Sequence, residues 1–283
     1  MPEAFPRPLE EHGQRVGVVG GGGFIGRTLV ASLRAQGHEV QRLGRGNRVD
    51  GPLDVLVFAQ GGRSAAGEAL DEAHVRTTER LLESVRPSTT VYLSSGECYG
   101  ALPVPFREDS PLEGSSPYAL AKLRGEALVR GFPGTKAHVL RLAVVYGLGQ
   151  TGTMLLPSLI ESVSRGEDVE LTAGEQSRDF VHVDDVAALV VACIERPSAG
   201  TFNCGSGVEI EVRAVALEVL RLFDALGSGR KRGRVLLGAL SYREREQMRY
   251  LLDCSAACST FDWAPRRALF TALEEWVSAA VGP

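Results

Sequence analysis

Apolar runs alternate with segments of helical spacing through the first half of the chain. Arg15–Val19, Glu39–Leu43 and Asp54–Ala59 are short and rich in apolar residues, which is typical of strands. In Phe24–Gln36 the apolar residues recur at helical spacing, and Gly37 follows as a stop signal. The pattern further predicts a helix over Glu68–Val85, a strand over Thr90–Ser94, a helix over Tyr118–Arg130 and a strand over Ala137–Leu142. Such alternation predicts a parallel sheet with helices on both faces.

The pattern loosens in the second half of the chain. It predicts a short strand over Arg178–Val183 and helices over Leu155–Ser164, Val186–Ile194, Ile210–Leu222 and Arg267–Val281. We expect this half to form mainly a smaller lobe over the strand ends.

Composition narrows the class of protein. The 283 residues are 44% hydrophobic and 23% charged, as in an ordinary globular protein, and the net charge of −4 favours neither nucleic acid nor an anionic membrane as partner. No apolar run reaches the roughly 18–20 residues that span a bilayer. Residues 1–14 lack the apolar core of a secretory signal and are interpreted as a flexible leader, so a cytoplasmic location is expected.

The five cysteines form no Cys-x-x-Cys motif and have no accompanying histidine pair. We therefore expect reduced thiols and no metal site.

A run of four glycines separates the first predicted strand from the first predicted helix. Glycine permits a tight turn, a close approach of the backbone to a pyrophosphate and close packing of helix on strand. The helix N-terminus offers N–H groups and a positive dipole end to that anion. We therefore predict a dinucleotide site lined by Gly20, Gly21, Gly22, Gly23, Phe24, Ile25 and Gly26, with Ala59 at the end of the third strand.

The second strand ends without the acidic residue that usually binds the adenosine ribose. Gly44 and Arg45 stand there instead, with Arg48 as a second possible contact. A small residue followed by arginine suits a 2′-phosphate, so NADP is favoured over NAD as cofactor.

Tyr118 and Lys122 lie one turn apart at the start of a predicted helix. An ammonium group close to a phenol favours the phenolate, and such a phenol can exchange a proton with a substrate carbinol. Tyr118 and Lys122 are therefore candidate catalytic residues, and Lys122 can also hold the nicotinamide ribose.

In order along the chain stand GGGGFIG, SSGECYG, SPYALAK, LRLAVVYGLGQ, RDFVHVDDVA and TFNCGSG. In these motifs the chain resembles, from Arg15 almost to its end, the extended short-chain dehydrogenase/reductases of the NAD-dependent epimerase/dehydratase family. The resemblance implies an α/β fold with a Rossmann-type doubly wound parallel sheet. It implies a dinucleotide-binding domain over 15–150 and a substrate lobe over 151–283, with 177–197 returning to the first domain.

The resemblance also implies roles for single residues. Ser95 would form a hydrogen bond with the reacting oxygen of the substrate. Tyr118 would act as the general acid/base, with Lys122 as its partner. Arg178 and Arg243 would contact the diphosphate of a nucleotide-linked sugar. His74 stands where the family often has asparagine, which puts that contact in doubt.

The chain departs from the family in its candidate acids. Glu97 matches a glutamate that serves as acid/base in dehydratases and decarboxylases, but Gly96 replaces the aspartate usual in dehydratases. We therefore expect no 4,6-dehydration, and Glu97 is either a fourth catalytic residue or only a hydrogen-bonding neighbour. Val144 and Leu148 also replace a common asparagine and proline, which weakens the diphosphate interpretation and leaves a non-nucleotide carbonyl or alcohol substrate as an alternative.

Only eight residues, Gly46–Leu53, separate Arg45 from the third strand. The family usually has a further strand and helix there, and a parallel crossover needs about a dozen residues. We therefore predict a sheet shortened by one edge strand and a more exposed adenine.

Together these features favour NADPH-dependent reduction of a keto-sugar carried on a nucleotide. The alternative is an epimerase or decarboxylase that retains its cofactor and acts through a transient ketone, assisted by Glu97. A sensor that binds the cofactor without catalysis is the third hypothesis. The resemblance also suggests a homodimer formed through the helices Glu68–Val85 and Tyr118–Arg130.

Overall fold

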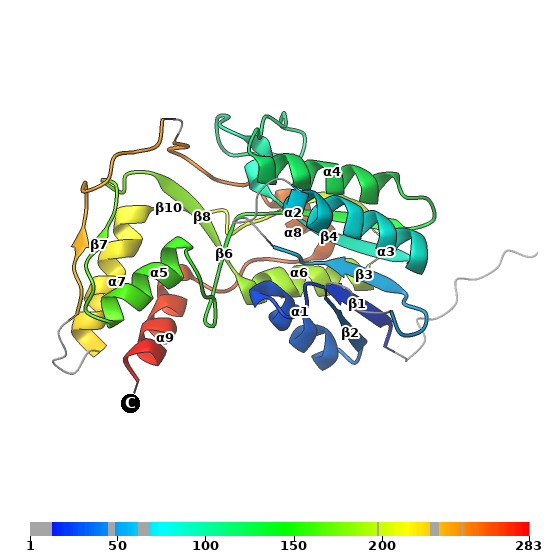
Figure 1. Cartoon of the computed structure of the whole chain (residues 1–283), viewed down its shortest axis with the longest axis horizontal. Coiled ribbons are helices and arrows are strands. Elements are labelled where there is room, and N and C mark those ends of the chain that lie inside the picture. The colour runs from blue at the N-terminus through cyan, green and yellow to red at the C-terminus, as the bar shows by residue number, and fades with distance from the viewer. Residues whose placement is uncertain are drawn as a thin grey trace, which may run out of the picture.

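The computed structural model describes residues 13–44, 49–61, 68–196, 198–226, 232–244 and 246–282. They form a larger lobe around a parallel sheet and a smaller lobe beside it (Figure 1). The sheet has six parallel strands in the order β2-β1-β3-β4-β5-β9. Their bounds are β1 Arg15–Val19, β2 Glu39–Leu43, β3 Val55–Phe58, β4 Thr89–Ser95, β5 Lys136–Leu142 and β9 Gly200–Cys204.

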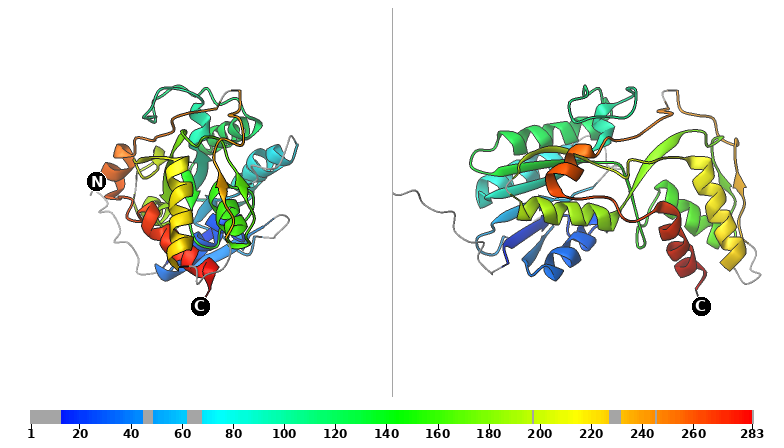
Figure 2. Two further views of the ribbon diagram at one scale, coloured as in Figure 1. Left: turned by 90° about the vertical axis from the view of Figure 1, so that its left-hand side faces the viewer. Right: turned by 180° about the vertical axis from the view of Figure 1, so that it is seen from behind.

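Helices cover both faces of this sheet. On one face lie α1 (Phe24–Ala35) and α6 (Val183–Glu195); on the other lie α3 (Thr77–Val85) and α4 (Pro117–Gly131) (Figures 1 and 2). The strand β3 has no exposed residue, and its side chains alternate between two apolar cores. Val55 and Val57 join the core of α1 and α6, while Leu56 and Phe58 join the core of α3 and α4. Continuous apolar strands are expected where both faces of a sheet are covered.

The sheet ends at β2, which pairs only with β1 among the described residues. Residues 49–54 lead into β3 without a strand, and residues 45–48 lie outside the described part. This arrangement confirms the predicted Rossmann-type sheet that lacks one edge strand. The exposure of the adenine stays a prediction.

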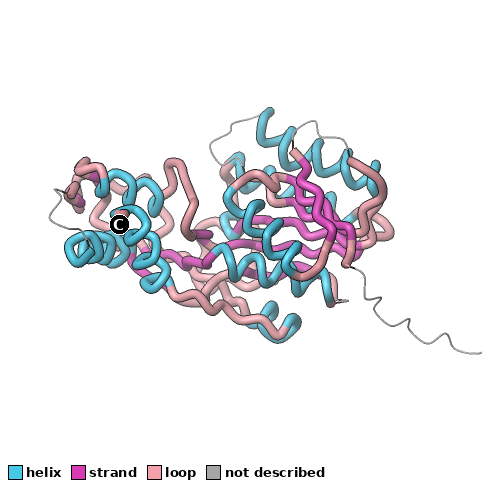
Figure 3. The backbone as a smooth tube through the Cα atoms, turned by 90° about the horizontal axis from the view of Figure 1, so that it is seen from below, coloured by secondary structure: helices cyan, strands magenta, loops and turns pink. Residues whose placement is uncertain are grey.

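The smaller lobe packs three helices around its own apolar core. These are α5 (Leu155–Ser164), α7 (Val212–Leu226) and the C-terminal α9 (Leu269–Val281), seen at one end of the molecule in Figure 3. Two small sheets accompany them, with strand orders β10-β8-β6 and β11-β7. Their bounds are β6 Val144–Tyr146, β7 Val169–Glu170, β8 Ser177–His182, β10 Glu209–Glu211 and β11 Val235–Leu236.

The chain passes between the lobes several times after residue 150. The strand β8 lies in a small sheet, whereas α6, β9 and the short helix α8 (Ser255–Phe261) return to the main core. The division of the chain into domains at residue 150 stays a prediction. In the part of the chain that the structure describes, no helix combines the length and apolar character of a membrane span.

Candidate active site

The glycine turn is as tight as the sequence predicts. Gly20 adopts φ +80°, which favours glycine, and Gly23 donates a backbone hydrogen bond to the Gly20 carbonyl. A Cβ at Gly26 would lie only 2.1 Å from that carbonyl oxygen. Gly26 therefore lets α1 start directly against the end of β1.

At Gly22 and Gly23, in the middle of the turn, glycine is not required by crowding within the protein. A Cβ at Gly22 would meet no atom within 4 Å, and one at Gly23 would meet only the Gly20 carbonyl oxygen, at 3.4 Å. Gly23 is the N-cap residue of α1 and makes no side-chain hydrogen bond, so no capping side chain occupies the N–H groups of the first turn. Bare backbone before a helix N-terminus fits a pyrophosphate, so these residues fit a dinucleotide.

The turn lies where the sheet order changes direction. β1 is followed along the chain by β2 on one side and by β3 on the other. Ala59 follows β3 and donates to the Val19 carbonyl at 2.9 Å, which places it beside the turn. In doubly wound sheets, ligands bind at this crossing point, outside the carboxyl ends of the strands.

Arg42 lies against the same turn, and sequence reasoning missed it. Its Cγ is 3.1 Å from the position of a Cβ at Gly21, and the residue is exposed. β2 is at the edge of the sheet, so Arg42 is a cation of that edge strand that lies against the glycine turn. The predicted contacts Arg45 and Arg48 lie outside the described residues.

Lys122 joins the ends of two strands to α4. Its side chain is 2% exposed, and its ammonium donates to the carbonyls of Leu93 at 2.7 Å and Gln60 at 3.3 Å. The ammonium nitrogen lies 5.6 Å from the ring centroid of Tyr118. Burial lowers the pKa of Lys122 to about 7. The structure therefore brings the predicted pair together at the carboxyl edge of the sheet.

Ser95 and Glu97 stand at the end of β4 and are tied to the start of α4. The Ser95 hydroxyl accepts a hydrogen bond from the Glu97 N–H at 3.2 Å. The Glu97 carboxylate accepts one from the hydroxyl of Ser116 at 2.6 Å. Ser116 also caps α4 by accepting from Ala119 N–H. Glu97 therefore orients the helix turn that carries Tyr118.

Gly96 cannot carry a side chain as the structure stands. A Cβ there would lie 2.2 Å from the Tyr250 hydroxyl oxygen and 3.1 Å from Leu252. Tyr250 is held by edge-on packing against Phe106, with ring centroids 5.7 Å apart, and is buried. An aspartate at position 96 would therefore displace a packed aromatic ring.

His74 packs against the predicted acid/base. It lies in the π-helical turn η1 (Glu72–Arg76), between α2 (Glu68–Asp71) and α3, so the predicted helix Glu68–Val85 is interrupted by a π turn. Its fully buried ring meets the Tyr118 ring edge-on at 5.8 Å. Burial and the charge of Lys122 lower the pKa of His74 to about 3, so the imidazole is neutral at physiological pH.

A buried ion pair supports the end of β4 from behind. Arg141 donates to both carboxylate oxygens of Glu126, at 3.1 and 2.9 Å, and neither side chain is more than 2% exposed. Glu126 also accepts from the Ser94 hydroxyl at 2.5 Å. Removing one partner of such a pair would leave an uncompensated buried charge, so this network fixes Ser94, the residue before Ser95, between β4 and α4.

The predicted substrate residues of the second lobe meet at a cavity of about 900 Å³. Arg178, Arg243 and Glu246 line it, and Val144 is also in its wall. Arg178 is only 20% exposed and pairs with Glu246 at 2.5 Å. Both predicted arginines therefore reach one cavity, and Glu246 accompanies them there.

Comparisons with known proteins agree with this geometry. The model of the NAD dependent epimerase/dehydratase family matches residues 49–205. A dTDP-6-deoxy-L-talose 4-dehydrogenase (NAD(P)(+)) from Kitasatospora kifunensis is 30% identical, with 95% of this chain and 96% of the relative covered.

Two solved structures are also similar. MoeE5 in complex with UDP-glucuronic acid and NAD superposes with a TM-score of 0.80 and 26% identity, covering 94% of this chain and 99% of that chain. RMD from Pseudomonas aeruginosa complexed with NADPH has a TM-score of 0.80 and 22% identity, covering 95% of this chain and 99% of that chain. It supports the fold alone.

Proposed function

This chain belongs to the NAD-dependent epimerase/dehydratase family, and from that premise we propose that it reduces a keto-sugar carried on a nucleotide with NADPH. The family contains NAD(P)-dependent enzymes of the short-chain dehydrogenase/reductase type that act on nucleotide sugars, and this chain is one of them. The observation that carries the proposal is the assembly of Ser95, Tyr118 and Lys122 at the strand ends beside the glycine turn.

The proposed roles follow from this geometry. The N–H groups of the glycine turn bind the pyrophosphate, and Lys122 orients the nicotinamide ribose. The nicotinamide ring supplies the hydride. Tyr118 gives a proton to the oxygen of the keto group as it becomes a hydroxyl, and Ser95 donates a hydrogen bond to the same oxygen. Lys122 stabilises the phenolate that Tyr118 then becomes.

The preference for NADPH rests on the end of β2. Gly44 stands where an acidic residue would repel a 2′-phosphate, and Arg42 lies against Gly21 beside that position. The 30% identical relative is named for both cofactors, and the two superposed structures hold NAD and NADPH, respectively. Arg45, which follows Gly44 in the sequence, is the second cation that the proposal invokes.

Net reduction is preferred to the rival reactions because of Gly96 and Glu97. The Tyr250 hydroxyl excludes an acid at position 96, which argues against dehydration. Glu97 is engaged by Ser116, in a supporting position. An epimerase or decarboxylase would use Glu97 as a proton donor or acceptor and would keep its cofactor. A non-catalytic sensor would have no need of the Tyr118 and Lys122 pair.

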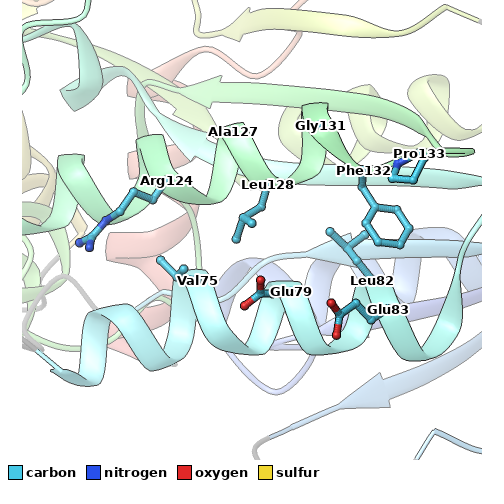
Figure 4. A pocket seen from close by; sticks show the side chains of 10 residues that line it. All are labelled: Val75, Glu79, Leu82, Glu83, Arg124, Ala127, Leu128, Gly131, Phe132 and Pro133. Carbon is cyan, nitrogen blue, oxygen red and sulfur yellow. The ribbon is translucent and has the colours of Figure 1, made fainter.

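We also propose a homodimer through α3 and α4. A groove of about 510 Å³ runs between these helices, and Figure 4 shows Leu128 of α4 and Leu82 of α3 within it. Glu79 and Glu83 line its α3 side and Arg124 its α4 side. This mixture of apolar side chains and opposite charges suits pairing with a second copy.

The five cysteines are unpaired, as expected for the proposed cytoplasmic location.

Turnover assays separate the hypotheses. The purified protein would be given NADPH and a panel of dTDP- and UDP-linked sugars, each as the keto form and as the hydroxyl form. Consumption of NADPH in proportion to product supports the reductase. Product formed without consumption supports the epimerase or decarboxylase, and no turnover with any substrate supports the sensor.

A further inference from the structure

The guanidinium of Arg178 is engaged within its own lobe. Its Nη1 donates to the carbonyls of Ser177 at 2.8 Å and Gln247 at 2.7 Å. Its Nη2 donates to the Glu246 carboxylate at 2.5 Å. The two side chains are 20% and 17% exposed, so water screens this ion pair only partly.

Glu246 and Arg243 are tied together by a backbone hydrogen bond. The N–H of Glu246 donates to the carbonyl of Arg243 at 3.0 Å. Arg178, Arg243 and Glu246 all line the 900 Å³ cavity. Among the described lining residues these three carry the charges, so the cavity has one net positive charge instead of two.

We propose that Glu246 is an internal counter-anion that the diphosphate of the substrate must displace from Arg178. The inference rests on the proposed function, because it assumes a nucleoside diphosphate group in this cavity. A diphosphate offers two charged groups and can span Arg178 and Arg243 together. A single phosphate on Arg243 would leave the Arg178–Glu246 pair intact. Glu246 thus makes the cavity selective for the longer and more highly charged group.

The structure provides a place for the displaced carboxylate. Glu246 also lines a neighbouring cavity of about 340 Å³, together with Gln247 and Arg249. The side-chain nitrogen of Gln247 is buried and donates no hydrogen bond within the described structure. Rotation of the Glu246 side chain would move its carboxylate from Arg178 toward this amide. A buried donor then gains an acceptor, which offsets part of the loss of the ion pair.

The test measures the affinity of the whole protein for UDP and dTDP by titration calorimetry. The variant Glu246→Gln removes the competing charge and keeps the shape. We expect it to bind nucleoside diphosphates more tightly, on the order of tenfold. Glu244→Gln is the matched control, because it removes the same charge from an exposed residue outside the cavity lining. Its affinity should stay within about twofold of wild type.

A second pair of variants asks whether the effect passes through Arg178. In an Arg178→Gln background, Glu246→Gln should give a smaller gain, because only the repulsion between the carboxylate and the diphosphate is relieved and no ion pair has to break. Melting temperatures and NADPH affinity verify that each variant is folded.

The inference is overturned if Glu246→Gln binds no more tightly than Glu244→Gln, or if its gain in affinity is undiminished without Arg178. In both cases the proposed function stands. If none of the folded proteins binds either diphosphate, the proposed substrate class fails, and the inference fails with it.

Discussion

The hydroxyl oxygen of Tyr250 lies 2.2 Å from the position that a Cβ would take at Gly96. The two residues are far apart in sequence, and their contact determines which acids the active site can hold. Position 96 lies between Ser95 and Glu97, where the family resemblance leads us to expect an aspartate in a dehydratase. In this chain the tyrosine ring fills that space, so the loop supplies no second acid.

This contact predicts a stability effect that depends on Tyr250. Gly96→Ala should lower the free energy of unfolding by about 1–3 kcal/mol, because the added methyl overpacks against the hydroxyl. Adding Tyr250→Phe removes that hydroxyl, and the nearest remaining atoms are then 3.1 Å from the added methyl group. The double variant should therefore recover much of the lost free energy of unfolding. Urea unfolding of the two single variants and the double variant measures the coupling.

Gly22→Ala is the matched control for this series. A Cβ at Gly22 meets no atom within 4 Å, so the substitution should cost less than about 1 kcal/mol. The Tyr250 hydroxyl does not restrict position 96 if Gly22→Ala and Gly96→Ala lower the free energy of unfolding equally, or if Tyr250→Phe restores none of it.

Much of the larger lobe could be predicted from local sequence. The strand Arg15–Val19 and the start of the next helix at Phe24 are confirmed, because the apolar run and the glycines define both ends. The short linker before β3 also predicted the shortened sheet, since chain length alone excludes a further crossover. These features depend on residues close together in the chain.

Features that depend on long-range contacts were not predictable. The strand β9 (Gly200–Cys204) is recognisable only by its pairing with β5, and its sequence GTFNC is too short and mixed to predict a strand. The contact of His74 with Tyr118 depends on the packing of η1 against α4. The pairing of Arg178 with Glu246 joins two segments of the small lobe, and no local pattern indicates it.

The buried ammonium of Lys122 predicts a specific pH dependence of stability. Burial lowers its pKa to about 7 in the folded chain, whereas an exposed lysine titrates near about 10.4. Between these values the unfolded chain keeps a proton that the folded chain has released. The free energy of unfolding therefore rises with pH in this window, because the cost of burying the charge is relieved.

Comparison with Lys122→Met isolates this effect. The stability of wild type relative to the variant should increase by roughly 1.4 kcal/mol per pH unit between about pH 8 and 9. Urea unfolding without cofactor, at a series of pH values for both proteins, measures this difference. If the free energy of unfolding changed with pH in the same way for wild type and Lys122→Met, the lowered pKa of Lys122 would be contradicted.

Glu97→Gln tests whether the carboxylate moves a proton. An amide oxygen can still accept the Ser116 hydroxyl, so a supporting role predicts a fall in kcat for keto-sugar reduction of less than about tenfold. A fall of about a hundredfold or more, in a protein of unchanged stability, would instead place Glu97 in proton transfer. Ser116→Ala should chiefly lower stability, by about 1 kcal/mol, because α4 loses its cap.

The groove between α3 and α4 predicts the state of assembly. Leu128→Asp places a charge within it, so a dimer that uses this face should dissociate, as measured by sedimentation equilibrium. Leu217→Asp, on the exposed face of α7 at 52% exposure, is the control and should leave the mass unchanged. A wild-type monomer, or a dimer insensitive to Leu128→Asp, would exclude this interface.

The central claim is that Tyr118 supplies a proton while a hydride passes between free NADPH and a nucleotide-linked keto-sugar. The most direct test uses NADPH carrying deuterium on the transferred position of the nicotinamide, with mass spectrometry of the sugar product. The account predicts a deuterated product from wild type and from the control Tyr242→Phe, a half-buried tyrosine whose hydroxyl accepts from the Glu175 N–H. Tyr118→Phe should be slower by about 10²–10⁴-fold while still binding NADPH. A product that contains no deuterium, or a Tyr118→Phe variant as fast as wild type, would contradict the account.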